Sequence, residues 1–518
     1  MKALKTKGRK ILALLLILLL GAVLRFWGLG NNPFIADEFL DINSSYGYFQ
    51  TGDWKAWDFN DGKQAVVNGN DARDERANVY KWQVAQVFRF FAPTEAAARS
   101  VSAVWGVLTV LIMYIVGWRL SGRKTVGLFA AFLFAVSVSG LEFDRRLRMY
   151  AMFFPMFLLF STSLFLLFEH EYKGRSRLLR RAWERTGLDP LYAIPTLLLG
   201  IISAMTHQLT ANILPIFGVY VVSMAVVEWR KGAGIRNKYV VISALGILGA
   251  VAAFITVPDK VRFFLGTLVW FDNHYSYLGY VVRDYAQPLF AIVLAAYGAW
   301  SLARTFERPK EAAWLVSSFM VPLVMAVWFW RRNEGQQYIF FAQAFLMILI
   351  AAGGYAVVRE AKSLLSAKWK HSLCVATVLL AVIVPHWGYF FQENNTYHQT
   401  SSGSSANYRK IFQYFRKNSE TGEALVSRNF RNYYWSGMHV PIYDFGGELS
   451  TEKLSVSELE SLMSSYPTGW VIASDNDMDY VSRDAETFMY KHMDRQSSPL
   501  IRGNVLVFRW GVMEESMR

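Results

Sequence analysis

Apolar stretches long enough to cross a lipid bilayer recur along most of this 518-residue chain. A membrane-spanning helix needs about 20 predominantly apolar residues, and these stretches meet or approach that length. Polar and charged residues mark where each stretch would leave the bilayer. We therefore predict about eleven spans, at residues 11–28, 100–119, 125–141, 150–168, 190–207, 210–228, 239–257, 286–303, 313–330, 338–358 and 371–390.

The charges between these stretches predict how the chain is threaded through the membrane. With the N-terminus in the cytoplasm, every connection on that side carries at least three Lys or Arg, which is the positive-inside pattern. Much of the formal net charge of +14 is thereby explained without a nucleic-acid partner. The connections are WRLSGRK, EYKGRSRLLRRAWER, EWRKGAGIRNK, ARTFERPK and REAKSLLSAKWK.

Composition agrees with a multi-pass protein of the plasma membrane. Hydrophobic residues make up 53% of the chain, which is too much for an ordinary soluble enzyme of this length. The single cysteine, Cys374, excludes an intrachain disulfide. The basic N-terminus and the apolar run after it lack a small-x-small cleavage site, so we predict an uncleaved first span.

The pattern changes after the last apolar stretch. Residues 1–390 form the predicted transmembrane domain, and the Ser/Asn-rich residues 391–407 resemble a linker. Beyond it, YRKIFQYFRKN, SELESLMSSY and AETFMYKHM have helical periodicity, and ALVSR, PIYDF, GWVIAS and VLVFRW are typical of short strands. The fold class is therefore a polytopic α-helical membrane protein with a small α/β domain, residues 408–518, on the extracytoplasmic face.

The long first outer loop, residues 29–99, carries most of the carboxylates near the predicted membrane surface. Asp37 and Glu38 lie side by side, within about ten residues of the first span. Adjacent carboxylates near a low-dielectric phase have perturbed protonation, which suits a general base or a metal ligand. A structural role, such as capping a loop helix, is an equal alternative on the residues alone.

Two short outer loops run against the charge rule, because they place arginines outside. Pairing with a nearby acid, such as Asp144 four residues before Arg148, would explain them, as would contact with lipid headgroups. Guanidinium groups also match phosphate oxygens bidentately, so the two loops together favour an anionic ligand at the outer interface. The external arginines are Arg145, Arg146, Arg148, Arg331 and Arg332.

Two further polar features have both a structural and a functional interpretation. His207 lies at the predicted outer end of the fifth span, where a histidine is commonly a satisfied interfacial group. SDNDMD, at residues 474–479, could form an ion or sugar site, although acidic surface loops are usually only solvated. For residues 408–518 we expect acceptor recognition or partner docking.

The order and spacing of several motifs resemble the GT-C glycosyltransferases, of the type that includes protein O-mannosyltransferases and the aminoarabinose transferase of lipid A. The resemblance runs through most of the chain. It is carried by ADEFLDINSSYGYFQTGDW, FRFFAPTEAAARSVSAVWGVLTVLIMYIVGWRLSG, RLRMYAMF, MTHQ and QYIFFAQAFLMILIAAG.

The resemblance implies a GT-C fold and transfer of a sugar from a polyprenyl phosphate to a hydroxyl acceptor on a protein, lipid or glycan. It implies that Asp37 is the catalytic base, with Glu38 beside it, and that the reaction inverts the anomeric centre. Arginines would stabilise the departing phosphate. The residues implied in donor phosphate or sugar binding are Arg148, Tyr150, Asp144, Arg145, Arg331, Arg332, His207, Glu75 and Arg76.

The sequence also departs from the family pattern. In DERANVYKW, Glu75 and Arg76 stand where relatives have the Glu-Lys of E-K-P, and no proline follows. Arg146 replaces a glutamate, and Gln337 replaces an arginine, so Arg331 or Arg332 would have to supply that charge. A D-x-D motif is absent near Asp37. We therefore expect no obligatory metal, with a divalent metal left possible.

Two other classes of function remain open at this point. A transporter or flippase of a lipid-linked sugar would show internal repeats and charges near the membrane midplane, and neither pattern is evident. A catalytically inactive scaffold is the other alternative. Intact Asp37 and Glu38 argue against it, whereas Arg146 and Gln337 keep it in play.

Overall fold

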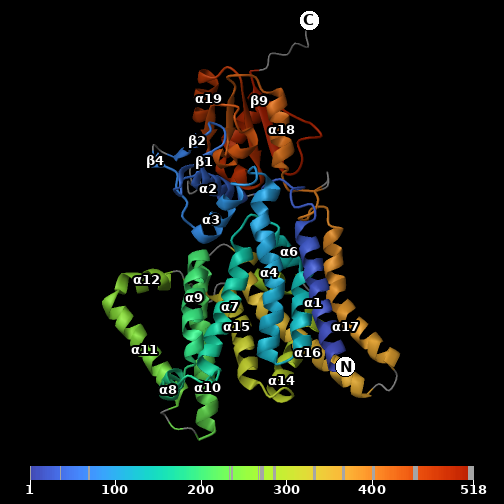
Figure 1. Cartoon of the computed structure of the whole chain (residues 1–518). Coiled ribbons are helices and arrows are strands. Elements are labelled where there is room, and N and C mark those ends of the chain that lie inside the picture. The colour runs from blue at the N-terminus through green and yellow to red at the C-terminus, as the bar shows by residue number, and fades with distance from the viewer. Residues whose placement is uncertain are drawn as a thin grey trace.

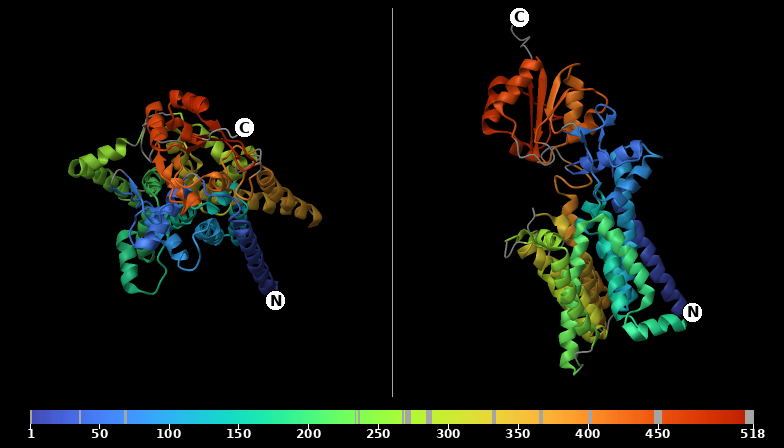
Figure 2. Two further views of the ribbon diagram at one scale, coloured as in Figure 1. Left: turned by 90° about the horizontal axis from the view of Figure 1, so that it is seen from above. Right: turned by 90° about the vertical axis from the view of Figure 1, so that its left-hand side faces the viewer.

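Long helices form a bundle, and a smaller α/β unit stands on one end of it (Figure 1). The first loop lies between the two, under the C-terminal unit, in both side views (Figures 1 and 2). The computed structural model describes residues 2–35, 37–67, 70–232, 234, 237–266, 268, 273–283, 288–330, 334–364, 368–399, 403–446 and 453–511.

The bundle helices follow the apolar stretches, and polar caps fix several of their ends. The Thr94 side chain accepts a hydrogen bond from the amide of Ala97 at the start of α4, and Gly122 ends this helix in a left-handed conformation. The helices are α1 (Lys2–Phe26), α4 (Glu95–Ser121), α5 (Lys124–Ala135), α6 (Val138–Asp144), α7 (Tyr150–Glu169), α9 (Ala193–Thr206), α10 (Ile213–Arg230), α11 (Lys238–Thr256), α14 (Pro288–Arg304), α15 (Pro309–Trp328), α16 (Gln343–Leu364) and α17 (Lys368–Phe390).

Shorter helices connect the members of the bundle. One of them, α8, lies at 98° to the segment that follows it. Single 3₁₀ turns mark the breaks between several of the long helices. These connecting elements are α8 (Arg177–Thr186), η1 (Pro190–Tyr192), η2 (Gln208–Asn212), α12 (Pro258–Gly266), α13 (Ser276–Arg283), η3 (Gln336–Tyr338) and η4 (Phe340–Ala342).

The chain is a multi-pass membrane protein. Among the described residues, six helical segments are long and apolar enough to cross a bilayer, or up to eight if two bent pairs each count as one span. These six coincide with predicted spans two, four, six, seven, nine and ten. Predicted spans one, eight and eleven fall on α1, α14 and α17. The total of eleven stays a prediction.

The third predicted span is bent and ends later than expected. The sequence predicted a span over residues 125–141 and then a short outer loop, LEFDRRLRM. Instead α5 ends at Ala135 and α6 begins at Val138, with an angle of 61° between them. Ser137 caps the second helix, since its hydroxyl accepts a hydrogen bond from the amide of Gly140. The first part of the supposed loop is therefore the last turn of α6.

The first loop is ordered by two helices and two small hairpins. Gly47 of α2 lies against the segment that leads to the first hairpin, where a Cβ would meet the Lys55 carbonyl oxygen at 1.7 Å. This close approach explains the glycine within a helix. The elements are α2 (Glu38–Thr51), β1 (Trp57–Asp58), β2 (Lys63–Gln64), β3 (Val66–Val67), β4 (Asn70–Asp71) and α3 (Asn78–Val87).

The C-terminal unit has the helices and strands that the sequence predicted. Its five-stranded sheet has the order β6-β5-β7-β9-β8; β6, β5 and β7 are parallel, and β9 is antiparallel to β7 and β8. The elements are α18 (Tyr408–Asn418), β5 (Ala424–Ser427), η5 (Asn429–Trp435), β6 (Ile442–Asp444), α19 (Val456–Ser465), β7 (Gly469–Ser474), η6 (Asp475–Tyr480), α20 (Arg483–His492), β8 (Asp494–Arg495) and β9 (Val505–Trp510).

One hydrophobic core joins the first loop to the C-terminal unit. Phe34 and Phe39 of the loop pack with Tyr408, Phe412 and Tyr434 of the unit. Aromatic residues bury large apolar areas and dominate the energetics of such contacts. The segment that carries Asp37 is thus held from above by the C-terminal unit.

The acidic SDNDMD segment has a structural role at one of its carboxylates. Asp477 is buried, and both of its oxygens bind the guanidinium of Arg431, which lies in η5. Its Oδ2 also accepts a hydrogen bond from the amide of Ser474. This carboxylate stabilises the unit internally and is not a surface ligand.

Candidate active site

Two carboxylates and one arginine meet where α2 starts beside the start of α7. Arg148 donates to Oδ2 of Asp41 at 2.9 Å, and its other terminal nitrogen lies 3.0 Å from Oδ2 of Asp37. Asp37 and Asp41 are four residues apart, so they share one face of α2. The side chain of Asp37 is 63% exposed, whereas those of Asp41 and Arg148 are 7% and 13% exposed. Asp37 is therefore the carboxylate that a ligand can reach.

Burial and charge set the protonation of the groups behind Asp37. Burial raises the pKa of Asp41, although Arg148 and Lys81 act in the opposite direction. Burial disfavours the charged form of Arg148, but the negative charges of Asp41 and Asp37 outweigh this effect and raise the pKa of Arg148 above its ordinary value. Burial lowers the pKa of Lys81, a side chain held by Ser44 Oγ at 2.9 Å and by Asp74.

Two more of the predicted residues continue this group along the end of the bundle. The Arg148 guanidinium lies 5.7 Å from the ring centroid of Tyr150, and the rings of Tyr150 and His207 are 5.3 Å apart. Nδ1 of His207 accepts a hydrogen bond from the amide of Leu209, so this histidine also shapes the turn after α9. The structure thus brings Asp37, Arg148, Tyr150 and His207 into one row.

Glu38 points away from this row and is fully bonded. Its two oxygens accept hydrogen bonds of 2.8 and 2.7 Å from Arg99, and one each from the amides of Leu147 (2.6 Å) and Ile35 (3.0 Å). Burial opposes its charge, but Arg99 and these amides hold the pKa of Glu38 below its usual value. Glu38 thus ties α2 to α4 and to the segment before α7, which positions Asp37.

Asp144 and Arg145 lie apart from the row and bind partners of their own. Asp144 does not pair with Arg148; its Oδ2 accepts from Nε of Arg25 at 2.7 Å, and both side chains are buried. Gly106 of α4 leaves the space for this pair, since a Cβ there would lie 2.4 Å from Nε of Arg25.

Arg145 fastens the end of α1. Its terminal nitrogens donate to the carbonyl oxygens of Leu24, Arg25, Trp27 and Gly28, and to that of Thr396 at 3.0 Å. Such carbonyls lack partners within a helix end, and a buried arginine satisfies several of them at once. Both terminal nitrogens of the guanidinium therefore bind backbone carbonyls in this structure.

The other predicted residues divide between the surface and the segments outside the described residues. Glu75 binds Arg73, and Arg76 binds Asp74 at 2.9 Å, both on the exposed side of the first loop. Asp74 in turn contacts Lys81, and the charge of Lys81 acts on Asp41 in the site. Arg331 and Arg332 lie outside the residues that the structure describes.

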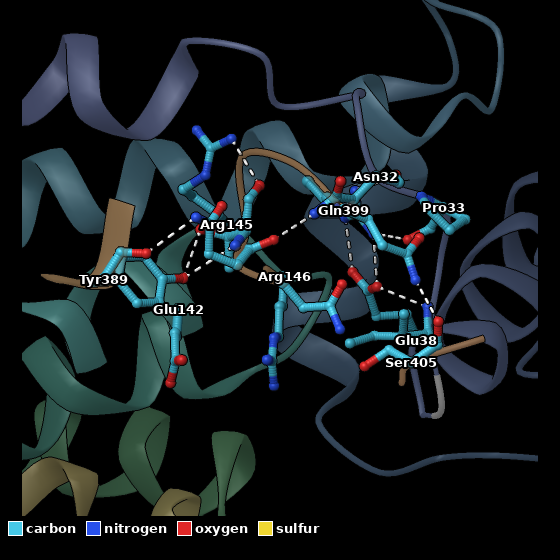
Figure 3. A pocket seen from close by; sticks show the side chains of 14 residues that line it. Asn32, Pro33, Glu38, Glu142, Arg145, Arg146, Tyr389, Gln399 and Ser405 are labelled. Atoms are coloured by element: carbon cyan, nitrogen blue, oxygen red, sulfur yellow. Dashed lines mark hydrogen bonds and ion pairs between the residues drawn. The ribbon is translucent and has the colours of Figure 1, made fainter. Parts of the chain in front are cut away.

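A small polar cavity of about 170 Å³ lies on the other side of Glu38, under the linker (Figure 3). Glu38 and Pro33 form one wall, and Arg145, Glu142 and Tyr389 lie across from them in Figure 3. Arg146 also lines it, and its Nε has no hydrogen-bond partner among the described residues. Arg145 lines this cavity, whereas its described lining includes none of the residues of the row, Asp37, Arg148, Tyr150 and His207.

Sequence reasoning missed Asp41 and Lys81 as members of the site. The signal for Asp41 was its i, i+4 spacing from Asp37 on a helix. Lys81 is a lone cation between aromatic residues of a buried helical stretch, which carries no motif. Among the described residues, no group of three or more His, Cys, Asp or Glu side chains is placed to hold a metal ion.

The sequence matches no family model and no curated protein, whereas the fold matches solved structures. One is the oligosaccharyltransferase AglB of the archaeon Archaeoglobus fulgidus, in complex with an inhibitory peptide and a dolichol-phosphate. It is 12% identical, with a TM-score of 0.63, over 95% of this chain and 73% of that chain.

A second solved structure is ArnT from Cupriavidus metallidurans bound to undecaprenyl phosphate. It is 13% identical, with a TM-score of 0.56, over 96% of this chain and 98% of that chain. In its apo state the same protein is 14% identical, with a TM-score of 0.55. The chain therefore shares the fold of AglB and ArnT, which agrees with the GT-C fold that its motifs predicted.

Proposed function

We propose that this chain is an inverting glycosyltransferase that moves a sugar from a polyprenyl phosphate to a hydroxyl acceptor. The observation that carries the proposal is Asp37, an exposed carboxylate 3.0 Å from a nearly buried arginine at one end of a GT-C bundle. Both structural neighbours were solved with a lipid phosphate bound, which supports a donor of this class.

Asp37 is the general base in this reaction. Its carboxylate accepts the proton of the acceptor hydroxyl while the acceptor oxygen bonds to the anomeric carbon. The bond from that carbon to the phosphate oxygen breaks, and its electron pair leaves with the lipid phosphate. Attack opposite the leaving group inverts the anomeric centre. The products are the glycosylated acceptor and the polyprenyl phosphate, with the proton on Asp37 and later released to water.

Arg148 holds Asp37 in place and presents positive charge beside the reacting atoms. Its contacts with Asp41 and with both the side chain and the carbonyl oxygen of Asp37 fix the start of α2. A preorganised cation in a water-poor site stabilises a developing phosphate charge without reorganising. Tyr150 and His207 border the same space and are the proposed contacts for the sugar.

No obligatory metal is part of this proposal, because Arg148 supplies the positive charge at the leaving group. The N-terminus is placed in the cytoplasm and the C-terminal unit outside, on the strength of the basic connections. The acceptor is a hydroxyl of a protein, a lipid or a glycan. The C-terminal unit packs directly on the loop that carries Asp37, which supports a part for it in acceptor recognition.

The test is sugar transfer by purified protein in lipid, with a panel of radiolabelled polyprenyl-phosphate sugars and membrane extract as acceptor. Asp37→Asn should lower the transfer rate by about 10²- to 10⁴-fold, the usual contribution of a general base, and should still bind the donor. Asp53→Asn is the matched control, because Asp53 is an exposed aspartate of the same loop paired with Arg73 at 2.8 Å.

The alternatives give different outcomes in the same assay. A transporter of lipid-linked sugars would move no label to an acceptor but would change the side of the membrane on which the donor lies. A scaffold would be indifferent to Asp37→Asn. Transfer by the wild type that survives Asp37→Asn would reject Asp37 as the base.

A further inference from the structure

A large apolar cavity lies between α1, α5, α16 and α17, away from the candidate active site. Its volume is about 700 Å³, and its walls are mostly aliphatic and aromatic. That volume falls in the range of about 300–1,000 Å³ typical of ligand pockets. Ile17, Phe129, Phe132, Val358 and Val378 form much of the wall.

Gly354 of α16 allows two wall residues of the cavity, Phe129 and Val378, to pack directly against this helix. A Cβ at this position would lie 2.6 Å from the ring of Phe129 and 3.2 Å from a methyl of Val378. The lower part of α17 leans away from the bundle in Figure 1. Arg359 and Lys362 are exposed, and Ile17 and Val375 are half-buried, so the cavity reaches the outer surface of the bundle, where lipid chains lie.

Positive charge gathers at one end of this cavity. Arg359 and Lys362, in the last turns of α16, line it, and neither has an ion-pair partner among the described residues. Thr125 also lines it, in the first turn of α5, where unpaired backbone amides favour an anion. An apolar groove with cations at one end matches an acyl chain that carries a negative headgroup.

This cationic end is opposite to the candidate active site. The helix α4 starts at Glu95, which contacts the C-terminal unit next to the site, and ends at Ser121, just before α5 begins. The charges are therefore one bilayer thickness from Arg148 and Asp37. A polyprenyl phosphate with its phosphate at the active site would leave these two cations unpaired.

We infer that the cavity binds an anionic glycerophospholipid of the leaflet opposite to the active site, with an acyl chain in the groove and its phosphate at Arg359 and Lys362. Each Lys or Arg near an anionic lipid surface contributes about fivefold to binding, so the two contribute roughly 30-fold. The bound lipid fills the space between α17 and the bundle, and α17 leads directly into the linker of the C-terminal unit.

Native mass spectrometry of the purified full chain tests this, with phosphatidylglycerol and phosphatidylcholine of identical acyl chains as probes. We expect one phosphatidylglycerol per chain to bind about 30-fold more tightly than phosphatidylcholine. The double variant Arg359→Gln/Lys362→Gln should lose that preference. The control Arg230→Gln/Arg304→Gln removes the same charge from the ends of α10 and α14, and should keep it.

Further variants keep the test decisive. Val358→Trp fills the groove and should weaken the binding of both lipids. If the double variant does not fold, each single variant, Arg359→Gln or Lys362→Gln, should bind phosphatidylglycerol about fivefold less tightly than the wild type does. Equal binding of the two lipids by the wild type would overturn the inference. Full preference in the double variant, or displacement of the bound lipid by polyprenyl phosphate, would overturn it too.

Discussion

The carboxylate of Glu38 and the guanidinium of Arg99 form two parallel hydrogen bonds, 2.8 and 2.7 Å long, between groups that are both buried. This pair joins the first turn of α2 to α4 and leaves Asp37, the adjacent residue, facing solvent. Two neighbouring carboxylates thus have different surroundings, since one is saturated by donors and the other has a single ion-pair partner.

The first prediction separates these two roles. Glu38→Gln leaves the Arg99 charge buried without its counter-ion, which costs about 3–5 kcal/mol when one partner of a buried pair is removed. We expect a clearly lower melting temperature, followed by thermal unfolding in detergent. Asp37→Asn, at an exposed position, should leave the melting temperature within the range of ordinary surface changes. A Glu38→Gln protein that melts normally but has lost transfer would assign Glu38 a direct chemical role.

The second prediction concerns pH. The pKa of Asp41 is raised by burial, so the folded state holds its proton at pH values where the unfolded state has lost it. Its contribution to stability is full below the ordinary pKa of 3.8 and is lost as the pH rises through the raised value. Thermal unfolding of wild type and Asp41→Asn from pH 4 to 7 should show the wild type losing stability relative to the variant.

Glu38 provides the opposite slope as an internal control. Because its pKa is lowered, its contribution is present above the ordinary value of 4.5 and falls away as the pH drops through the lowered value. The difference between wild type and Glu38→Gln should therefore shrink on acidification. Each variant gives a difference in stability from the wild type. If both differences changed in the same direction with pH, the assignment of Asp41 as the buried carboxyl group that retains its proton would be wrong.

The third prediction tests the arginine between the two aspartates. Arg148→Gln removes the cation that contacts Asp37 and Asp41, so transfer should fall by at least tenfold through the loss of leaving-group stabilisation. The loss should be mainly in kcat, because the charge it opposes develops in the transition state. Arg73→Gln is the control, an exposed arginine of the same loop that also binds two carboxylates. Equal activities of the two variants would contradict the proposed role of Arg148.

Much of the local structure followed from the sequence because it depends on neighbours in the chain. The predicted helix YRKIFQYFRKN coincides with α18, Tyr408–Asn418, since its apolar residues recur at helical spacing and face one core. Asp37 and Arg148, which the structure places 3.0 Å apart, were predicted as site residues from motifs whose spacing is local. The sequence did not indicate which residue of each motif faces solvent and which one is bonded inside the protein.

The sequence did not predict contacts between residues that lie far apart along the chain. Asp144 and Arg25 are 119 residues apart, and Arg145 reaches backbone carbonyls of α1 that no side-chain pattern indicates. The four-residue spacing suggested a pair between Asp144 and Arg148 instead. Similarly, hydropathy cannot distinguish a straight span from the bent pair α5 and α6, because the two helices together are long and apolar enough to count as one span.

The last prediction concerns how the C-terminal unit acts on the site. The Tyr434 hydroxyl accepts a hydrogen bond of 2.6 Å from the amide of Phe34 and donates one of 2.8 Å to Glu95. Tyr434→Phe leaves a buried amide and a carboxylate oxygen with one partner fewer, which costs about 1.5–3 kcal/mol for a bond to a charged group. Since Phe34 lies three residues before Asp37, the cost should appear locally.

Hydrogen exchange is the direct measurement. In Tyr434→Phe the amides of residues 34, 35 and 37–41 should exchange faster, and transfer should fall while the sheet of the C-terminal unit stays protected. Tyr414→Phe is the matched control, because its hydroxyl binds Gln496 at 3.1 Å inside the unit and away from the loop. It should leave exchange at residues 34, 35 and 37–41 unchanged. If Tyr434→Phe also leaves exchange in this segment unchanged, the C-terminal unit does not position Asp37 through this contact. The unit would then contribute to the reaction only by binding the acceptor.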